Sequence, residues 1–319
     1  MKQFTSLADV PDLQSLLQKA LEVKKNPFAF SDLGKNKTLG LVFFNPSLRT
    51  RMSTQKAAQN LGMNVLIMDL NNDGWKIETT AGTVMNGGTQ EHLIEAAGVL
   101  SQYCDLIGIR TFPGLSDKDE DYGEKILNQF IRYAKVPVIS LESATLHPLQ
   151  SFADTMTIEE QKTVPRPKVV LTWTPHIKSI PQCVANSFAQ WMKEAEVDFV
   201  IAQPEGMELS TEFTAGIPIF HHQNEALKDA DFVYAKNWSS FSDYGQAKSG
   251  HENWMITAEK MALTNNGKFM HCLPVRRNVE VSDDVLDSAN SLVLEQANNR
   301  TYAAQTVFIE LLNQIHSHQ

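Results

Sequence analysis

Hydrophobic positions recur along this chain with two different spacings. Near the start, apolar residues lie three and four positions apart, which is the pattern of an amphipathic helix that begins at Pro11. The positions concerned are Leu13, Leu16, Leu17, Ala20 and Leu21. Further along, short apolar runs rich in Val, Ile and Phe alternate with helix-like segments. Because strands buried in a parallel sheet appear as continuous apolar runs, this alternation predicts an α/β protein.

The first half of the chain contains four predicted strands, at 38–44, 64–70, 105–110 and 136–140, with helices at 48–61, 91–103 and 124–134. After a helix at 148–160, the second half contains predicted strands at 168–173, 197–203, 217–221, 231–235, 268–272 and 291–295, and it ends with a helix at 298–315. The two prolines of 162–168 favour a domain boundary by turn chemistry, and the acidic segment 116–124 is predicted to be a solvated loop. We therefore predict two doubly wound parallel-sheet domains.

Length and composition agree with a folded protein of two domains. The chain has 319 residues, of which 42% are hydrophobic and 20% are charged, close to ordinary globular usage. Its 37 acidic residues outnumber 28 basic ones, giving a formal charge of -9. This balance argues against binding to nucleic acid through a general basic field. An anionic ligand would have to be held by a local cluster.

The three cysteines, Cys104, Cys183 and Cys272, are too few and too scattered for a disulfide framework. The first eleven residues lack the apolar stretch of a secretory signal, and no run approaches the roughly 18 apolar residues that cross a bilayer. We expect a cytoplasmic protein that binds no membrane.

The segment 45–51, Asn-Pro-Ser-Leu-Arg-Thr-Arg, passes from a predicted strand through a proline turn into a predicted helix. Free N–H groups of a first helical turn, the Ser47 and Thr50 hydroxyls and the Arg49 guanidinium suit one phosphate. A serine-capped helix start with solvated arginines would give the same pattern.

Other polar residues follow predicted strands, where open α/β sheets bind ligands. They are Arg110, the tetrapeptide His147-Pro148-Leu149-Gln150, Lys236, and the tetrapeptide His271-Cys272-Leu273-Pro274. Trp75 lies in the polar loop 71–88, and Arg300 is expected to begin the last helix. Taken singly, each is compatible with a surface or core role. The chain has no G-x-G-x-x-G after a strand and no P-loop, and its histidines lack metal-like spacing, so we expect no nucleotide, cofactor or metal.

Together these motifs, in this order, resemble the aspartate/ornithine carbamoyltransferase family over the whole chain. The tetrapeptide at 271–274 is similar to that of the ornithine branch. Enzymes for free ornithine carry an acidic residue before a Ser-Met-Gly loop, whereas this chain has Lys236 in the segment 234–238, Tyr-Ala-Lys-Asn-Trp. A lysine there would repel a free α-ammonium, so the resemblance favours the members that act on N-acylated ornithine.

The resemblance implies a homotrimer with shared active sites, in which Trp75 reaches a neighbouring subunit. It implies a carbamoyl phosphate-binding domain at 1–147, joined by the C-terminal segment 298–319, and an N-acylornithine-binding domain at 148–297. The expected carbamoyl phosphate-binding residues are Ser47, Leu48, Arg49, Thr50, Trp75, Arg110, His147, Gln150, Cys272, Leu273 and Arg300. Of these, the catalytic residues would be Arg49, Thr50, Arg110, His147, Gln150 and Cys272. The expected N-acylornithine-binding residues are Glu142, His176, Lys236 and Arg276.

The reaction implied is transfer of the carbamoyl group to the δ-amine of N-succinyl-L-ornithine, in arginine biosynthesis. The acyl group depends on Gln90, which matches a proline in succinyl-type and a glutamate in acetyl-type members, and on Glu280, which lies near a lysine position of acetyl-type members. Because Gln90 is neutral, it would not repel a succinyl carboxylate. N-acetylornithine or free ornithine as substrate, or a non-catalytic anion-binding regulatory protein, are the alternatives.

Overall fold

The computed structural model describes residues 1–70 and 74–317. The chain divides into two compact units. Unit 1 comprises Met1–Gly114, Asp119–Leu149 and Arg300–Gln319, and unit 2 comprises Leu115–Lys118 and Gln150–Asn299. Residues 71–73 of the predicted loop 71–88, and residues 318–319 of the predicted C-terminal segment, lie outside the described residues.

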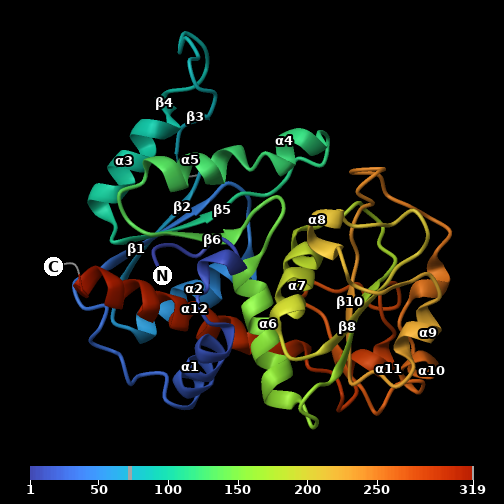
Figure 1. The fold of residues 1–319 in the computed structure, drawn as a ribbon. Coiled ribbons are helices and arrows are strands. Elements are labelled where there is room, and N and C mark those ends of the chain that lie inside the picture. Colours follow the sequence, from blue (N-terminus) through green and yellow to red (C-terminus); the bar gives the residue numbers. More distant parts are fainter. Residues whose placement is uncertain (71–73, 318–319) are drawn as a thin grey trace. The chain divides into compact units, whose positions relative to one another are not determined.

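Unit 1 is built on a four-stranded parallel sheet in the order β2-β1-β5-β6 (Figure 1). Its strands are β1 (Thr38–Phe43), β2 (Asn64–Asp69), β5 (Leu106–Arg110) and β6 (Val138–Glu142), and two short strands, β3 (Ile77–Glu78) and β4 (Glu91–His92), pair separately. Its helices are η1 (Leu7–Asp9), α1 (Leu13–Lys25), α2 (Leu48–Asn60), α3 (Leu93–Tyr103), α4 (Lys118–Tyr122), α5 (Lys125–Tyr133) and most of α12 (Val293–Ser317).

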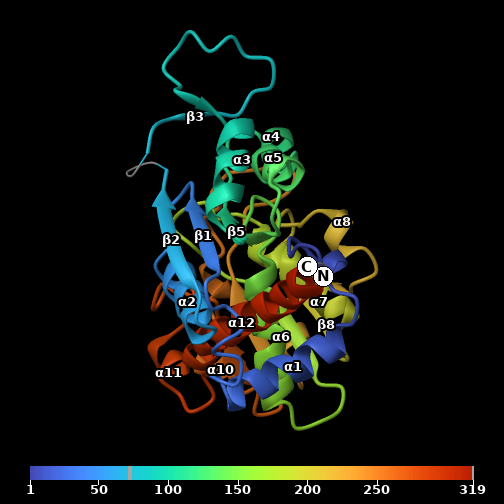
Figure 2. The ribbon, with the colours of Figure 1, turned by 90° about the vertical axis from the view of Figure 1, so that its left-hand side faces the viewer.

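Helices cover both faces of this sheet. On one face, α3 and α5 pack with Val42, Ile107 and Ile109 in a core that includes Phe130. Close packing there requires Gly40, since a Cβ at this position would lie 2.6 Å from the Cys104 Sγ atom. Figures 1 and 2 show α2 and α12 on the opposite face. The alternating apolar pattern of the sequence is thus explained by a buried central sheet.

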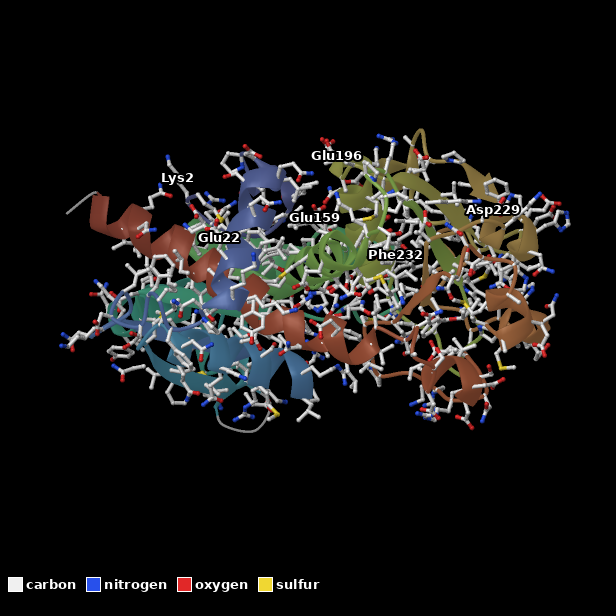
Figure 3. All side chains as sticks on the ribbon, turned by 90° about the horizontal axis from the view of Figure 1, so that it is seen from below. Lys2, Glu22, Glu159, Glu196, Asp229 and Phe232 are labelled. Atoms are coloured by element: carbon white, nitrogen blue, oxygen red, sulfur yellow. The ribbon has the colours of Figure 1, made fainter. Side chains whose placement is uncertain are left out.

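Unit 2 contains a five-stranded parallel sheet in the order β11-β10-β7-β8-β9. Its strands are β7 (Lys168–Trp173), β8 (Asp198–Ala202), β9 (Ile219–Phe220), β10 (Phe232–Lys236) and β11 (Lys268–Met270). Its helices are α6 (Pro148–Gln161), α7 (Cys183–Glu194), α8 (Thr211–Thr214), α9 (Gln223–Leu227), η2 (Glu252–Trp254), α10 (Ala258–Met261), α11 (Asp283–Leu286) and the first turns of α12. Figure 3 shows Phe232 of β10 inside this unit, whereas Asp229 lies at its margin.

Both sheets have a topological switch point, where successive connections leave in opposite directions. In unit 1 it lies between β1 and β5, and in unit 2 between β7 and β10. The segments that follow these four strands therefore lie beside each other in pairs. They carry the residues 45–51 and Arg110 in unit 1, and His176 and Lys236 in unit 2.

Some predicted elements differ from the structure. The predicted strand at 291–295 is wrong, because Ser291 makes a single bridge to Phe269 and α12 begins at Val293. Arg300 consequently lies inside that helix and does not begin it. The predicted loop 116–124 contains the short helix α4, and the proline segment 162–168 lies within unit 2. No helix in the described part of the chain is long and apolar enough to cross a bilayer.

Candidate functional site

The N-terminus of α2 forms the centre of a candidate anion site in unit 1. Ser47 is the N-cap residue and has an extended backbone, but its side chain makes no capping hydrogen bond. The first-turn N–H groups of a helix have no partner within the helix and attract negative charge. Arg49 lies in this turn, and its buried Nε atom has no hydrogen-bond partner among the described residues. The turn therefore offers both backbone and side-chain donors to an anion.

Arg110, at the end of β5, is a buried residue that holds the neighbouring loop. Its Nη2 and Nε atoms donate to the Oε2 atom of Glu142 at 2.7 and 3.0 Å. Its Nη1 atom donates to the backbone oxygens of Asn45 and Pro46 at 3.1 and 3.2 Å. Arg110 therefore fixes the turn that leads into α2, in addition to placing positive charge beside it.

A third arginine reaches α2 from the other end of the sequence. The Nη2 atom of Arg300 donates to the Thr50 hydroxyl at 2.7 Å, and both residues are buried. This contact orients the Thr50 side chain. It also joins two residues that are 250 positions apart in the sequence.

His147 is buried among these charges and is neutral at physiological pH. Burial lowers its pKa to about 3; Arg300, Arg110 and Arg49 act in the same direction, and Glu142 opposes them. Its Nε2 atom lies 3.9 Å from Glu142 Oε2. The Nδ1 atom has no partner among the described residues. A neutral imidazole here could hydrogen-bond a carbonyl oxygen without adding charge.

Unit 2 places a second group of predicted residues around the loop that follows β11. The Nε atom of Arg276 donates to His176 Nε2 at 3.1 Å, and burial lowers the pKa of His176. Lys236, at the end of β10, is buried and donates to the backbone oxygen of Asn237 at 3.1 Å. Cys272 is half-buried in the same loop. These residues offer cationic and thiol groups at the switch point of unit 2.

Glu280 forms hydrogen bonds within the loop that follows β11. Its Oε1 atom lies 3.3 Å from His271 Nε2, and its Oε2 atom accepts the Arg276 N–H at 2.8 Å. His271 in turn accepts the Leu273 N–H at 2.9 Å through Nδ1. Burial by itself would raise the pKa of Glu280, but the bond and charge of His271, the charge of Lys236 and the Arg276 N–H together lower it. The ionised carboxylate therefore fixes the loop.

The structure brings the predicted residues together in two groups. Unit 1 contains Ser47, Leu48, Arg49, Thr50, Arg110, Glu142, His147 and Arg300. Unit 2 contains Gln150, His176, Lys236, Cys272, Leu273, Arg276 and Glu280. Trp75 and Gln90 are exposed and lie near β3 and β4 in unit 1, where the Trp75 Nε1 atom donates to Glu91 Oε2 at 2.9 Å. Within the described residues, no group of three His, Cys, Asp or Glu side chains could hold a metal ion.

Sequence reasoning missed three residues that hold these groups in place. Glu124 accepts hydrogen bonds from Ser143 Oγ at 2.6 Å and Thr145 N at 2.8 Å, in the loop before His147. His271 belongs to a recognised tetrapeptide but was given no role of its own. Asp154 lies four positions after Gln150, and this helical spacing, which puts both on one face, is the signal that could have found it.

Two doubly wound units, one with an arginine-rich helix N-terminus at its switch point, define an α/β enzyme that handles a small anionic substrate. Residues 2–160 match the family model for the carbamoyl-P binding domain of aspartate/ornithine carbamoyltransferases, and residues 181–311 match that for the Asp/Orn binding domain. The chain belongs to the aspartate/ornithine carbamoyltransferase family.

Individual relatives are similar over nearly the full length. The chain is 52% identical to N-succinylornithine carbamoyltransferase of Bacteroides thetaiotaomicron, covering 98% of this chain and 99% of the relative. It is 36% identical to N-acetylornithine carbamoyltransferase of Xanthomonas campestris, covering 95% of each. A crystal structure of a glutamate-to-alanine variant of N-acetyl-L-ornithine transcarbamylase, complexed with carbamyl phosphate and N-succinyl-L-norvaline, matches with a TM-score of 0.93 at 35% identity, covering 98% of this chain and 100% of that one.

Proposed function

We propose that this protein transfers the carbamoyl group of carbamoyl phosphate to the δ-amine of N-succinyl-L-ornithine, giving N-succinyl-L-citrulline and phosphate. The observation that carries the proposal is the group formed in unit 1 by Arg49, Arg110 and Arg300 around the N-terminus of α2, with the neutral His147. It offers cationic donors for a phosphate and, beside them, a neutral imidazole for a carbonyl oxygen.

The chemistry follows from these donors. The δ-amine nitrogen attacks the carbamoyl carbon, and the bond from that carbon to the phosphate oxygen breaks. Thr50, Arg110 and His147 hydrogen-bond the carbonyl oxygen as it gains negative charge, while Arg49 and the helix N–H groups stabilise the departing phosphate. The phosphate takes the proton released by the amine, so no protein side chain needs to form a covalent bond. Catalysis then depends on positioning and electrostatic stabilisation.

The preference for a succinyl group is supported by identity and by charge. The relative named for N-succinylornithine is 52% identical, against 36% for the relative named for N-acetylornithine. In unit 2, the cations Lys178, Lys236 and Arg276 lie on segments that surround the switch point, and a second carboxylate on the substrate could use this charge. An acetylornithine enzyme with one glutamate replaced by alanine was solved with N-succinyl-L-norvaline, so in that protein the loss of one acid is compatible with a succinylated ligand.

A product assay tests the proposed function. The protein is incubated with labelled carbamoyl phosphate and, in separate reactions, N-succinylornithine, N-acetylornithine or ornithine, and the citrulline product is identified by mass spectrometry. We expect the highest kcat/KM with N-succinylornithine. A higher kcat/KM with N-acetylornithine would contradict the proposed acyl group but not carbamoyl transfer. If none of the three substrates gave a citrulline product, carbamoyl transfer itself would be contradicted.

The proposal includes a cytoplasmic homotrimer in arginine biosynthesis, with Trp75 completing the site of a neighbouring subunit. The side chain of Trp75 is 57% exposed within its own chain, which is unusual for so large an apolar residue unless it meets a partner or ligand. Mixing inactive Trp75→Ala chains with inactive Arg49→Ala chains should restore part of the activity through hybrid sites. Hybrids verified by mass that remain inactive would contradict the shared site.

A further inference from the structure

A buried carboxylate in unit 2 joins two segments that are far apart in the sequence. Asp154 lies on α6 and is fully buried. Its Oδ1 atom accepts hydrogen bonds from Gln150 Nε2 at 2.7 Å and from Gln296 Nε2 at 2.6 Å. Gln296 Oε1 accepts the backbone N–H of His271 at 3.0 Å. One chain of hydrogen bonds therefore connects the start of α6 with the start of the loop after β11.

The directions of these hydrogen bonds are fixed by one backbone N–H group and by the carboxylate. The His271 N–H can only donate, so the atom of Gln296 that faces it must be the carbonyl oxygen. The amino group of Gln296 then faces Asp154, and Asp154 Oδ1 must accept. Gln150, bound to that same oxygen, must also present its amino group. The orientation of the Gln150 amide is thus set by the Asp154 carboxylate, which accepts from both glutamines.

This arrangement leaves the carbonyl oxygen of Gln150 as its remaining hydrogen-bonding atom. The Oε1 atom is buried and has no partner among the described residues. An unpartnered buried acceptor costs free energy until a donor arrives. Carbamoyl phosphate carries such a donor in its amino group, whereas acetyl phosphate has a methyl group at the same place.

We propose that Asp154 is a positioning residue that holds Gln150 with its carbonyl oxygen toward the carbamoyl amino group and so selects carbamoyl phosphate over acetyl phosphate. The inference rests on the proposed function, because it takes carbamoyl phosphate as the ligand. Asp154 itself touches no substrate and acts through Gln150. The same carboxylate, through Gln296, also fixes the loop that carries Cys272.

The test compares the affinities of carbamoyl phosphate and acetyl phosphate, measured by calorimetry on the full chain. The parent should bind carbamoyl phosphate more tightly. In Asp154→Ala, water can enter and satisfy the two amide donors, Gln150 can turn, and the preference should fall about tenfold, the value of one hydrogen bond of roughly 1.4 kcal/mol. Acetyl phosphate affinity should change less than about twofold. A loss of affinity for both ligands by the same factor would overturn the inference, since that is what a purely structural role predicts.

Three further variants keep the test decisive if Asp154→Ala folds poorly. Asp154→Asn retains an oxygen that can accept both amide groups, so the preference should survive, and its loss would contradict the argument from hydrogen-bond direction. Gln150→Leu should lose the preference by the same factor as Asp154→Ala, and the double variant should lose no more. Additive losses in the double variant would show that Asp154 does not act through Gln150.

Thr155→Val is the matched control. Thr155 is a buried neighbour on α6 whose hydroxyl donates to Ser151 O at 2.7 Å, away from Asp154, so its removal should leave the preference unchanged. A change in preference there would overturn the assignment to Asp154. If the parent did not bind carbamoyl phosphate, the proposed function would be overturned. If the parent bound it and Asp154→Ala kept the preference for it over acetyl phosphate, this inference alone would be overturned.

Discussion

The two units present their candidate residues at equivalent places in similar sheets, but with different electrostatics. In unit 1, Arg49, Arg110 and Arg300 gather around a helix N-terminus, and Glu142 is the acidic partner found among them. In unit 2, the buried acids Asp154 and Glu280 each accept hydrogen bonds from the segments that carry the site.

This difference separates two tasks. The groups in unit 1 retain unfilled donors, as at Arg49 Nε, and so provide binding energy for an anion. The buried acids of unit 2, Asp154 and Glu280, accept hydrogen bonds from other groups of the protein and so determine how the neighbouring side chains and loop are oriented. Variants in unit 1 should therefore remove affinity or stability, whereas variants at the buried acids of unit 2 should change selectivity.

The largest effect is expected for Arg49→Ala. It removes a donor to the departing phosphate, and losses of this kind typically reduce turnover by about 100- to 1000-fold. Arg49 makes no hydrogen bond or ion pair within the described residues that would hold the fold, so the thermal unfolding midpoint should stay close to that of the parent. Arg51→Ala is the control, because Arg51 is exposed two positions further along α2. Equal losses in both variants would contradict the site at the start of α2.

A second effect concerns the buried pair of Arg110 and Glu142. Arg110 stabilises the fold as well as the site, because it is bonded to Glu142 and to two loop carbonyls. Glu142→Leu leaves the guanidinium buried without its partner, a change that typically costs about 3 to 5 kcal/mol of unfolding free energy. Urea unfolding followed by circular dichroism measures this cost.

The control for Glu142→Leu is a substitution in an exposed ion pair. Arg277 and Asp287 form such a pair, with side chains 51% and 64% exposed. Asp287→Leu should change the unfolding free energy far less than Glu142→Leu does, since water screens exposed pairs. Similar costs for the two substitutions would show that the Arg110 pair contributes no more than a surface contact.

A smaller effect is expected from pH, through His147. Its pKa is about 3 in the folded protein and about 6.5 in an unfolded chain. Between these values the unfolded state binds more protons, so the folded state should lose stability as pH falls below 6.5, by about 2 kcal/mol at pH 5. His147→Gln removes this contribution. Urea unfolding at pH 7 and pH 5 should show a shallower loss in the variant, and identical slopes would mean that His147 is not buried in a neutral form.

The smallest effect is expected for Gln90→Glu. Gln90 is exposed in its own chain, so a new carboxylate there should not disturb folding. If it faces a bound succinyl group, charge repulsion should lower kcat/KM for N-succinylornithine several-fold and leave N-acetylornithine nearly unchanged. Gln90→Met is the uncharged control. An equal fall for both substrates would remove Gln90 from the acyl-binding region.

How far the sequence predicted the structure depends on whether a feature is local. The strand predicted at 38–44, the helix from Leu48 and the turn between them follow from an apolar run, a proline and a serine, and all three are confirmed, with the strand observed at Thr38–Phe43. The strand predicted at 291–295 is wrong because the buried residues Val293 and Gln296, three positions apart, suit one face of a helix. A short apolar run contains too few residues for its periodicity to distinguish a helix from a strand.

The candidate site shows the same limit. The motifs at Ser47–Arg51 and 147–150 were visible because their chemistry is contiguous. The bonds from Arg110 to Glu142, from Arg300 to Thr50 and from Asp154 to Gln296 were not, since they join side chains separated by 32, 250 and 142 positions. Nothing in local spacing encodes such pairings, and only the topology of the two sheets creates them.

The three cysteines differ in exposure, so alkylation of the most accessible one can report on the state of the loop after β11. Cys104 is packed against Gly40, where burial raises the pKa of its thiol, and Cys183 is buried in α7, so both should react slowly with iodoacetamide. Cys272 is half-buried in the loop after β11 and should be the first to be alkylated. The rate at which this one sulfur is labelled would then record, without any assay of turnover, whether the loop is open to solvent or covered by a ligand.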